Sequence, residues 1–192
     1  YSLFSKYLYI FERKKLREKR NISKDVDAIL FGYNRIGFGI LSSLKKIKRN
    51  YLVVDFNPDT IAGLTKLRIP CVYGDADDDS LLRDLPLKNL KIAVSTIPDL
   101  DTNELLVEAI KTENPDAIVI LRAHTIDDAM QLYKKGADYV LTPHFLGGEY
   151  LARMLSIIKT DKEGYKEEKE RHIKMLTERF ERGQEHPEVA RD

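Results

Sequence analysis

Length, composition and charge exclude several classes of protein before any motif is considered. A chain of 192 residues, 43% hydrophobic and 33% charged, can bury one good core but hardly two substantial domains. Its single cysteine, Cys71, excludes an internal disulfide and a multi-cysteine metal site, and the four histidines lack metal-ligand spacing. The net charge of +1 divides into +6 for residues 1–24, −3 for 25–159 and −2 for 160–192. Because the central part is slightly acidic, no nucleic-acid partner is predicted.

The first 24 residues are predicted to be a connector. The chain opens with Tyr1 rather than Met. Its first residues place apolar side chains at helical spacing, at Leu3, Phe4, Tyr7, Leu8 and Phe11, and a basic run follows at 13–20. This pattern is typical of a cytoplasmic helix end leaving a bilayer, although the apolar part is far too short to span one. An amphipathic linker helix packed on the domain or on a second copy explains it equally well. Because no secretory signal is recognisable, we expect a reducing cytosolic setting. With the basic, membrane-like start, we expect this chain to lie on the cytoplasmic face of the cell membrane, as part of a membrane protein.

From Asp25 onward, short apolar segments alternate with helical ones. We expect strands at six runs: Val26–Phe31, Tyr51–Asp55, Cys71–Tyr73, Ile92–Ile97, Ala117–Leu121 and Tyr139–Leu141. Helices are expected between or after them, at residues 35–48, 58–67, 79–85, 101–113, 125–135 and 148–158. This alternation predicts a doubly wound, Rossmann-like α/β fold with a six-stranded, mainly parallel sheet and helices on both faces. Ligands bind such sheets at the carboxyl ends of the strands.

The segment after the first strand has the pattern of a phosphate-binding turn. A glycine at its start permits a sharp turn, and a second one five residues later lets the next helix lie close to the sheet. The first N–H groups of that helix favour a phosphate. The candidate cofactor-binding residues here are Gly32, Tyr33, Asn34, Arg35, Ile36 and Gly37. Asn34 stands where the dinucleotide pattern has its middle glycine, which opposes close approach of a full pyrophosphate.

An acidic residue follows at the distance that this pattern requires. Asp55 closes the second strand, 23 residues after Gly32. A carboxylate at this position accepts hydrogen bonds from ribose hydroxyls and repels a 2′-phosphate. Phe56, the next residue, is included in the predicted cofactor site.

The ends of strands three, four and five supply further candidates. They are Gly74, Asp75, Ala76, Ser95, Thr96 and Arg122. The Asp75 carboxylate is suited to accept from an adenine amino group, and the two hydroxyls are suited to the ribose or phosphate side. Each residue alone is better explained as a turn residue or helix cap. Their convergence on one edge of the sheet is what favours a binding site, and no metal site is predicted.

The composition becomes strongly charged after Lys159. Apolar residues still occur at i, i+3 and i+7, namely Ile173, Leu176 and Phe180. This spacing predicts a charged amphipathic helix that frays through Gly183 and Pro187. We therefore divide the chain into a basic connector (1–24), a nucleotide-binding domain (25–158) and a charged helical tail (159–192).

Taken in order, the motifs of residues 25–158 resemble the regulator of potassium conductance domain, also called the potassium-transport nucleotide-binding or TrkA-N-like domain. The carriers of the resemblance are Gly32–Gly37, Val53–Asp55, Asn57–Asp59, Tyr73–Ala76, Asp101–Asn103, Ile120–Ala123, Gly136–Val140 and Pro143–Leu151. Members of this family are cytoplasmic Rossmann modules attached to potassium channels, Trk and Ktr transporters and cation/proton antiporters. The family prefers glycine at position 34.

The resemblance implies a ligand and an assembly. It implies phosphate contacts from residues 32–37, with Arg35 reaching a phosphate directly, ribose contacts from Asp55, and adenine-side contacts from Asp75 and Ala76. The ligand is NAD(H) or one of AMP, ADP and ATP. The resemblance also implies a homodimer or higher even oligomer, paired along the edge after strands five and six and attached to a transmembrane cation transporter. The family's small C-terminal ligand subdomain is not recognisable in residues 160–192.

Three functional hypotheses follow. The leading one is a non-catalytic domain that senses NAD(H) or an adenine nucleotide and gates a potassium or cation transport protein. The alternative is a Rossmann-type NAD-dependent oxidoreductase, but the one Tyr-x-x-x-Lys pair, Tyr165 with Lys169, lies in the charged tail, so no catalytic residue is predicted. The third, suggested by Asn34, is a structural dimerisation module with an inactive pocket. The sequence leaves open the nucleotide, the ion and whether the ligand activates or inhibits.

Overall fold

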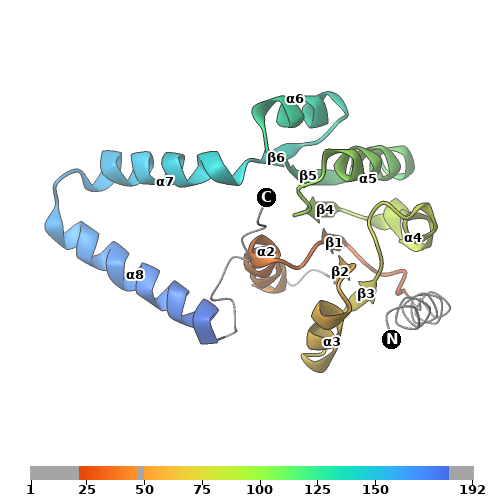
Figure 1. Cartoon of the computed structure of the whole chain (residues 1–192), viewed down its shortest axis with the longest axis horizontal. Coiled ribbons are helices and arrows are strands. Elements are labelled where there is room, and N and C mark those ends of the chain that lie inside the picture. The colour runs from red at the N-terminus through yellow and green to blue at the C-terminus, as the bar shows by residue number, and fades with distance from the viewer. Residues whose placement is uncertain (1–21, 47–49, 182–192) are drawn as a thin grey trace, which may run out of the picture. The chain divides into compact units, whose positions relative to one another are not determined.

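The computed structural model describes residues 22–46 and 50–181, and it contains the expected alternation of strands and helices (Figure 1). The six strands are β1 (Ala28–Phe31), β2 (Tyr51–Asp55), β3 (Cys71–Tyr73), β4 (Ile92–Ser95), β5 (Ile118–Arg122) and β6 (Tyr139–Leu141). The helices are α2 (Arg35–Lys46), α3 (Pro58–Lys66), α4 (Asp79–Asp84), the 3₁₀ turn η1 (Leu87–Asn89), α5 (Leu100–Glu113), α6 (Ile126–Lys134), α7 (Pro143–Ile158) and α8 (Lys162–Glu181).

All six strands pair in parallel, in the order β3-β2-β1-β4-β5-β6. The chain runs outward from β1 to β3 and then returns to place β4 on the other side of β1. Phe31, the last residue of β1, is in register with Val54 on one side and Ser95 on the other. This arrangement confirms the predicted doubly wound fold and creates a switch point beyond the carboxyl end of β1, where such sheets bind ligands.

Helices cover both faces of the sheet, with α2 and α3 on one side and α4, α5 and α6 on the other (Figure 1). The four residues of β1 explain why its sequence is continuously apolar. Ile29 and Phe31 belong to the core under α4–α6, while Ala28 and Leu30 belong to the core under α2 and α3. All four are fully buried, so neither face of this strand has a place for a polar side chain.

Polar residues define where several helices begin. Asn57 accepts hydrogen bonds from the first turn of α3, whose first residue is Pro58, and Asp78 and Asp99 cap α4 and α5. Thr125 caps α6 in a reciprocal capping box with Asp128. Each cap satisfies N–H groups that the helix itself leaves without partners. These caps position the loops that follow β2, β3, β4 and β5.

Several boundaries differ from the sequence prediction, among them the end of β5 and the start of α7. Arg122 is the last residue of β5 rather than a residue beyond it. Helix α7 begins at Pro143, five residues earlier than expected, because proline suits the first turn of a helix and the helix continues through Gly147 and Gly148. Glycine pairs disfavour helices, but here neither glycine has a neighbouring atom within 4 Å of an added Cβ, so no close packing requires them.

The chain forms two compact units, residues 1–142 and residues 143–192. The sequence-based division after residue 158 follows the change in composition, whereas the compact units divide before α7. The second unit consists of α7 and α8, and Tyr150 of α7 joins Glu168 and Arg171 of α8 through side-chain hydrogen bonds. The hydrogen bond to Glu168 raises the pKa of Tyr150. Gly183, Pro187 and connector residues 1–21 lie outside the described residues.

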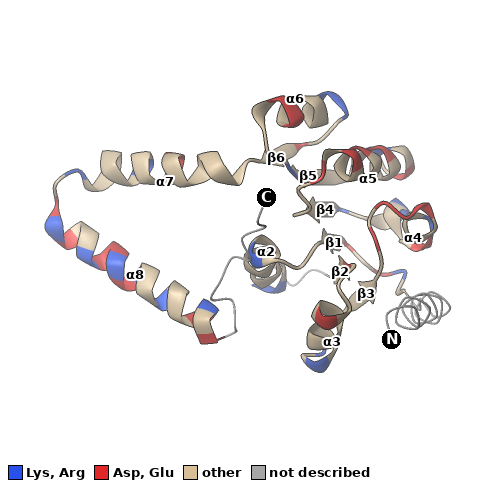
Figure 2. Ribbon diagram, in the orientation of Figure 1, with Lys and Arg blue, Asp and Glu red and all other residues tan. Residues whose placement is uncertain are grey.

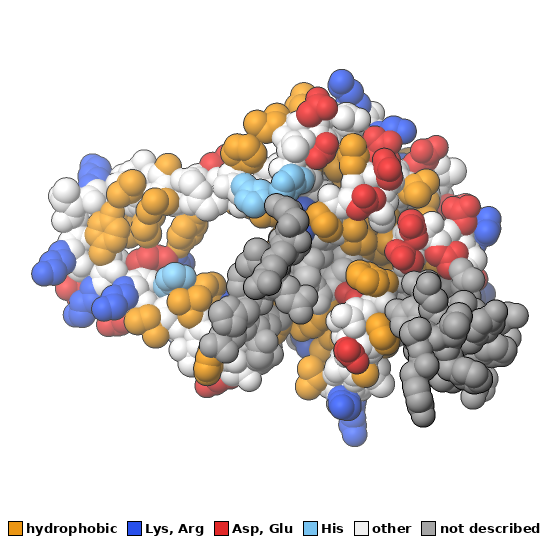
Figure 3. Space-filling view, in the orientation of Figure 1, with side chains coloured by type: hydrophobic (Ala, Val, Ile, Leu, Met, Phe, Trp, Pro, Cys, Tyr) orange, Lys and Arg blue, Asp and Glu red, His pale blue; other side chains and the backbone are white. Residues whose placement is uncertain are grey.

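The second unit has a distinctive surface. Helix α7 carries few charges, whereas α8 alternates acidic and basic residues (Figure 2). Large apolar side chains are exposed on both helices, as the orange side chains on the left of Figure 3 show: Phe145, Tyr150, Leu151, Leu155, Ile157, Ile173, Met175, Leu176 and Phe180. Within residues 22–46 and 50–181, none of the helices is both long and apolar enough to span a bilayer.

Candidate functional site

The turn between β1 and α2 depends on its two glycines. Gly32 has a φ of +82°, which L side chains rarely adopt, and its N–H donates to the carbonyl of Val54 at 2.8 Å. A Cβ on Gly37 would collide with the carbonyl oxygen of Gly32, so the helix reaches the strand this closely only with glycine at that position. The two glycines therefore have the roles that their spacing predicted, and replacing either one changes the turn itself.

Asn34 caps α2 with its own side chain. Its Oδ1 accepts from the backbone N–H groups of Ile36 (2.9 Å) and Gly37 (3.2 Å), while its Nδ2 donates to the carbonyl of Thr96 (3.2 Å). The sequence predicts that the first N–H groups of this helix face a phosphate. In the structure they already have an acceptor, because asparagine is a preferred residue at this position of a helix. A glycine here, as the family prefers, would leave both N–H groups open.

Asp55 joins the first two loops of the site. It is 8% exposed, and its Oδ2 accepts from the backbone N–H of Tyr33 at 2.6 Å, while Oδ1 accepts from that of Asn57 at 2.8 Å. These bonds fix the carboxylate at the carboxyl end of β2, as predicted. A carboxylate has about four acceptor positions, so both oxygens retain capacity for ribose hydroxyls. Phe56, next in sequence, is 62% exposed and offers an aromatic face on the same loop.

Ser95 and Thr96 lie beneath the site, without exposed surface. They are 1% and 0% exposed. The hydroxyl of Thr96 donates to the carbonyl of Gly32 at 2.9 Å, and the hydroxyl of Ser95 accepts from the N–H of Ile97 at 3.2 Å. The sequence predicts that these hydroxyls face the ribose or phosphate. In this conformation they instead hold the glycine turn and the loop after β4, because hydroxyls of buried residues satisfy nearby backbone groups.

Two arginines converge at this edge of the sheet. Arg122 donates from Nη1 to the carbonyl of Thr96 at 3.2 Å, and its buried Nε has no hydrogen-bond partner. Burial lowers the pKa of Arg122, and the nearby positive charge of Arg35 lowers it further. Arg35 is exposed in the first turn of α2. Two guanidinium groups close enough to repel each other, one with an unsatisfied N–H group, create a local positive potential that an anion would relieve.

The loop after β3 meets the site beside Asp55. The N–H of Gly74 donates to the carbonyl of Asp55 at 3.0 Å, and Ala76 is buried against the core. Asp75 is exposed. The pKa of Asp77 is raised, first by partial burial and then by the negative charge of Asp75. The structure thus brings Asp75 and Asp55 onto neighbouring loops, as the sequence predicted.

Asn103 holds two of these loops together, and the sequence indicated it only as part of a family motif. This side chain, in the first turns of α5, is fully buried. Its Nδ2 donates to the carbonyls of Ile97 (2.8 Å) and Arg122 (2.9 Å), and its Oδ1 is buried without a partner. A polar side chain at a core position of an amphipathic helix is the signal that reveals such a residue.

The family model of the TrkA-N domain matches residues 28–143. The chain therefore belongs to the TrkA-N domain family, which confirms the resemblance inferred from its motifs. The match covers the whole sheet and ends at the first residue of α7.

Named relatives include potassium-transport proteins. Potassium channel protein 1 of Methanocaldococcus jannaschii is 25% identical over 128 residues, which are 66% of this chain and 38% of that protein. The glutathione-regulated potassium-efflux system protein KefC of Cronobacter sakazakii is 26% identical over 143 residues, 74% of this chain and 23% of KefC. The chain thus spans well under half the length of these relatives.

Solved structures share the fold. The TrkA-N domain of the inner membrane protein YbaL from Escherichia coli has a TM-score of 0.63 at 23% identity, covering 68% of this chain and 97% of that one. The Kef C-terminal domain of Shewanella denitrificans, in an AMP-bound form, has a TM-score of 0.58 at 19% identity, covering 79% and 91%. The GsuK channel bound to NAD has a TM-score of 0.55 at 18% identity, covering 74% and 26%.

Proposed function

We propose that this domain binds an adenine nucleotide at the carboxyl edge of its sheet and thereby regulates a potassium or cation transport protein on the cytoplasmic face of the membrane. Asp55 would take the ribose hydroxyls, Asp75 and Phe56 the adenine, and Arg35 with Arg122 the phosphate. The Kef and GsuK neighbours that bind AMP and NAD support a ligand of this class. The domain itself performs no chemistry in this proposal.

The observation that carries the proposal is the pair of arginines beside the glycine turn. Arg122 is half-buried, is repelled by Arg35, and keeps one buried N–H without an acceptor. A buried N–H group without an acceptor costs free energy, so this group is a candidate to meet an acceptor on a ligand. A phosphate group supplies a negative charge beside the two guanidinium groups and a hydrogen-bond acceptor for the Nε–H of Arg122.

Asn34 favours a mononucleotide over a dinucleotide. Its side chain occupies two N–H groups at the start of α2 and fills the position where a pyrophosphate approaches the backbone. A single phosphate can instead reach the arginines without displacing this cap. We therefore place AMP, which has a single phosphate, ahead of NAD(H) as a ligand of this chain.

To regulate a transport protein, nucleotide binding must change how structural units are arranged relative to one another. Two paired domains provide such units. Helix α6 exposes apolar side chains one and two turns apart, at Ile126 (62%), Met130 (53%) and Tyr133 (42%). This stripe lies beside the β5–β6 edge, where the resemblance implies that two modules pair. A homodimer along this edge is part of the proposal, and the relatives support attachment to a membrane transport protein.

The oxidoreductase alternative has less support. Tyr165 and Lys169 lie on α8, in the unit of residues 143–192, whereas the candidate site belongs to the unit of residues 1–142. The two relatives described above are a potassium channel and a potassium-efflux system.

A thermal-shift panel tests the proposal. AMP, ADP, ATP, NAD, NADH and NADPH are added to the chain at increasing concentration. A ligand at one hundred times its dissociation constant adds about 2.7 kcal/mol to stability, so the true ligand raises the melting temperature by several degrees. We expect the largest shift with an adenine mononucleotide and a smaller one with NADPH than with NADH, because Asp55 repels a 2′-phosphate. No shift with any of the six contradicts the proposal.

A further inference from the structure

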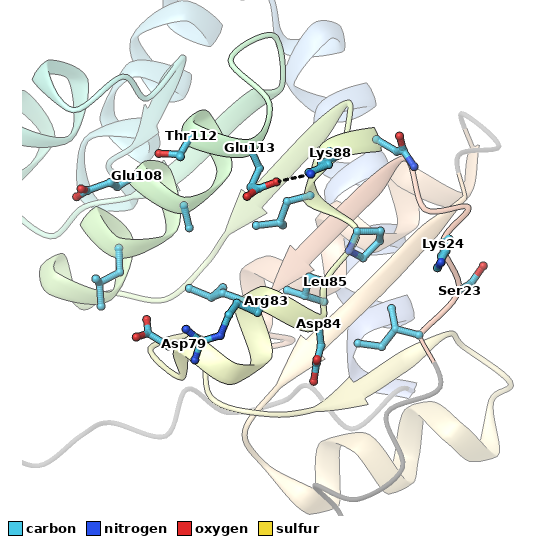
Figure 4. A pocket seen from close by; sticks show the side chains of 17 residues that line it. Ser23, Lys24, Asp79, Arg83, Asp84, Leu85, Lys88, Glu108, Thr112 and Glu113 are labelled. Carbon is cyan, nitrogen blue, oxygen red and sulfur yellow. Dashed lines mark ion pairs between the residues drawn. The ribbon is translucent and has the colours of Figure 1, made fainter.

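A groove between α4 and α5 is separate from the candidate nucleotide site. Its cavity volume is about 740 Å³, and it is bordered by α4, η1, α5 and the residues just before β1 (Figure 4). Its floor is apolar, with Leu82, Leu85 and Leu87 buried and Leu105 42% exposed. None of the candidate nucleotide-binding residues lines it.

The chain enters the domain along this groove. Ile22, Ser23 and Lys24 form one of its walls, and Ile22 packs against the core cluster under α4 and α5. The connector therefore reaches the domain beside an open apolar surface. Ten residues separate Phe11 from Ile22, which allows a span of roughly 15 Å as helix and about twice that when extended.

The charges of the groove and the connector are complementary. Its border carries the carboxylates of Asp79, Asp84, Glu108 and Glu113 against the cations Lys24, Arg83 and Lys88, a small excess of negative charge. Lys88 is paired with Glu113 at 3.6 Å, and Glu108 lies 3.9 Å from Lys135 at the end of α6. Figure 4 shows Asp79 and Glu108 coming from opposite sides of the groove, from α4 and α5. The connector has seven basic and two acidic residues before Ile22. Its basic run lies between its apolar residues and the point of entry.

We propose that the apolar side chains of residues 3–11 dock in this groove of the same chain, with the basic run at 13–20 lying along the acidic border. Leu3, Phe4, Tyr7, Leu8 and Phe11 fall on one face at helical spacing, which matches the apolar floor. Occupation of the groove covers Leu105 and ties the connector to α4 and α5. Helix α4 begins at Asp79, three residues after Ala76, so it borders the candidate nucleotide site at its start and the docked connector along its side.

A single tryptophan tests this docking directly. The chain contains none, so Leu8→Trp introduces a unique fluorophore into the intact chain. We expect emission at short wavelength and severalfold weaker quenching by acrylamide than in the denatured chain. Adding Leu105→Glu places a carboxylate on the apolar floor, which lowers the docked population roughly tenfold or more and exposes the tryptophan. Glutamate is a good helix former, and Leu105 is half-exposed, so the fold tolerates the change.

Leu67→Glu is the matched control. Leu67 is 69% exposed at the end of α3, on the opposite face of the sheet, and this variant should leave the tryptophan protected.

The protection should also survive dilution and a tenfold excess of Leu105→Glu chain that lacks tryptophan. Loss of protection in either test assigns the segment to a second copy and overturns the proposal. A tryptophan that is exposed from the outset, protected regardless of Leu105→Glu, or protected only with phosphatidylserine vesicles overturns it as well. None of these readouts requires a nucleotide, so they are independent of the proposed function.

Discussion

A single side chain, Asn34, sets the character of the candidate site. It satisfies the helix N–H groups that a phosphate would otherwise bind, and it anchors the turn to Thr96. The family's glycine would leave the turn intact but open. The identity of this residue therefore decides how deeply a ligand's phosphates approach α2.

Replacing Asn34 with glycine should shift the ligand preference toward NAD. The change exposes the N–H groups of Ile36 and Gly37, and a cap-to-glycine replacement costs only a few tenths of a kcal/mol in stability. Hydrogen bonds to a charged group contribute about 1.5–3 kcal/mol, so we expect NAD affinity to rise about tenfold relative to AMP. Isothermal titration of both ligands measures this ratio.

Asn34→Asp is the control for that experiment. Aspartate keeps the cap but adds a negative charge beside the phosphate position, so both ligands should bind more weakly. An unchanged NAD-to-AMP ratio in Asn34→Gly would show that the cap does not determine ligand choice.

At the scale of elements, the helix starts determine the positions of the loops around the site. Asp99 caps α5, which carries Asn103, and it accepts from the hydroxyl and the N–H of Thr102 at 2.7 and 2.8 Å. These bonds lower the pKa of Asp99 below its usual value. The cap thus links the stability of α5 to pH.

The stabilising contribution of Asp99 should depend on pH with a definite sign. Because its pKa is lower in the folded chain, the contribution is complete above the unfolded pKa, about 3.9, and is lost as the pH falls through the folded value. Asp99→Asn keeps a cap that does not titrate. The stability of the natural chain relative to this variant should fall by at most about 1 kcal/mol between pH 6 and pH 3, because Asp99 is exposed. Urea unfolding at several pH values measures this difference, and a constant difference would contradict the cap's role.

Particular residues show how far the sequence predicts these elements. The spacing of Gly32, Gly37 and Asp55 follows from the local geometry of a strand, a turn and a helix. The sequence alone therefore predicts the glycine turn and the carboxylate beside it. It does not predict the burial of Ser95 and Thr96, because this burial depends on contacts with the turn after β1, more than sixty residues away. The early start of α7 was missed because Gly147 and Gly148 disfavour a helix, and the sequence alone does not show that the helix nonetheless continues through them.

At the scale of the whole molecule, the exposed stripe on α6 predicts pairing of two copies. Met130→Glu places a charge at the centre of this stripe without touching the candidate nucleotide site. We expect the natural chain to be a dimer by light scattering, and the variant to raise the dimer dissociation constant by roughly tenfold or more. Leu67→Glu, on α3, should leave the dimer unchanged. A natural chain that is monomeric at high micromolar concentration, or a dimer indifferent to Met130→Glu, would contradict this assembly.

The central claim is that an adenine nucleotide binds where Arg35 and Arg122 converge. Calorimetric titration of AMP into the natural chain, Arg122→Gln and Arg68→Gln tests it most directly, since Arg68 is an exposed arginine at the end of α3. A charge-assisted hydrogen bond contributes about 1.5–3 kcal/mol, so Arg122→Gln should weaken AMP binding at least about tenfold, and Arg68→Gln should leave it unchanged. Equal binding by all three chains, or no binding of AMP by the natural chain, would contradict the account.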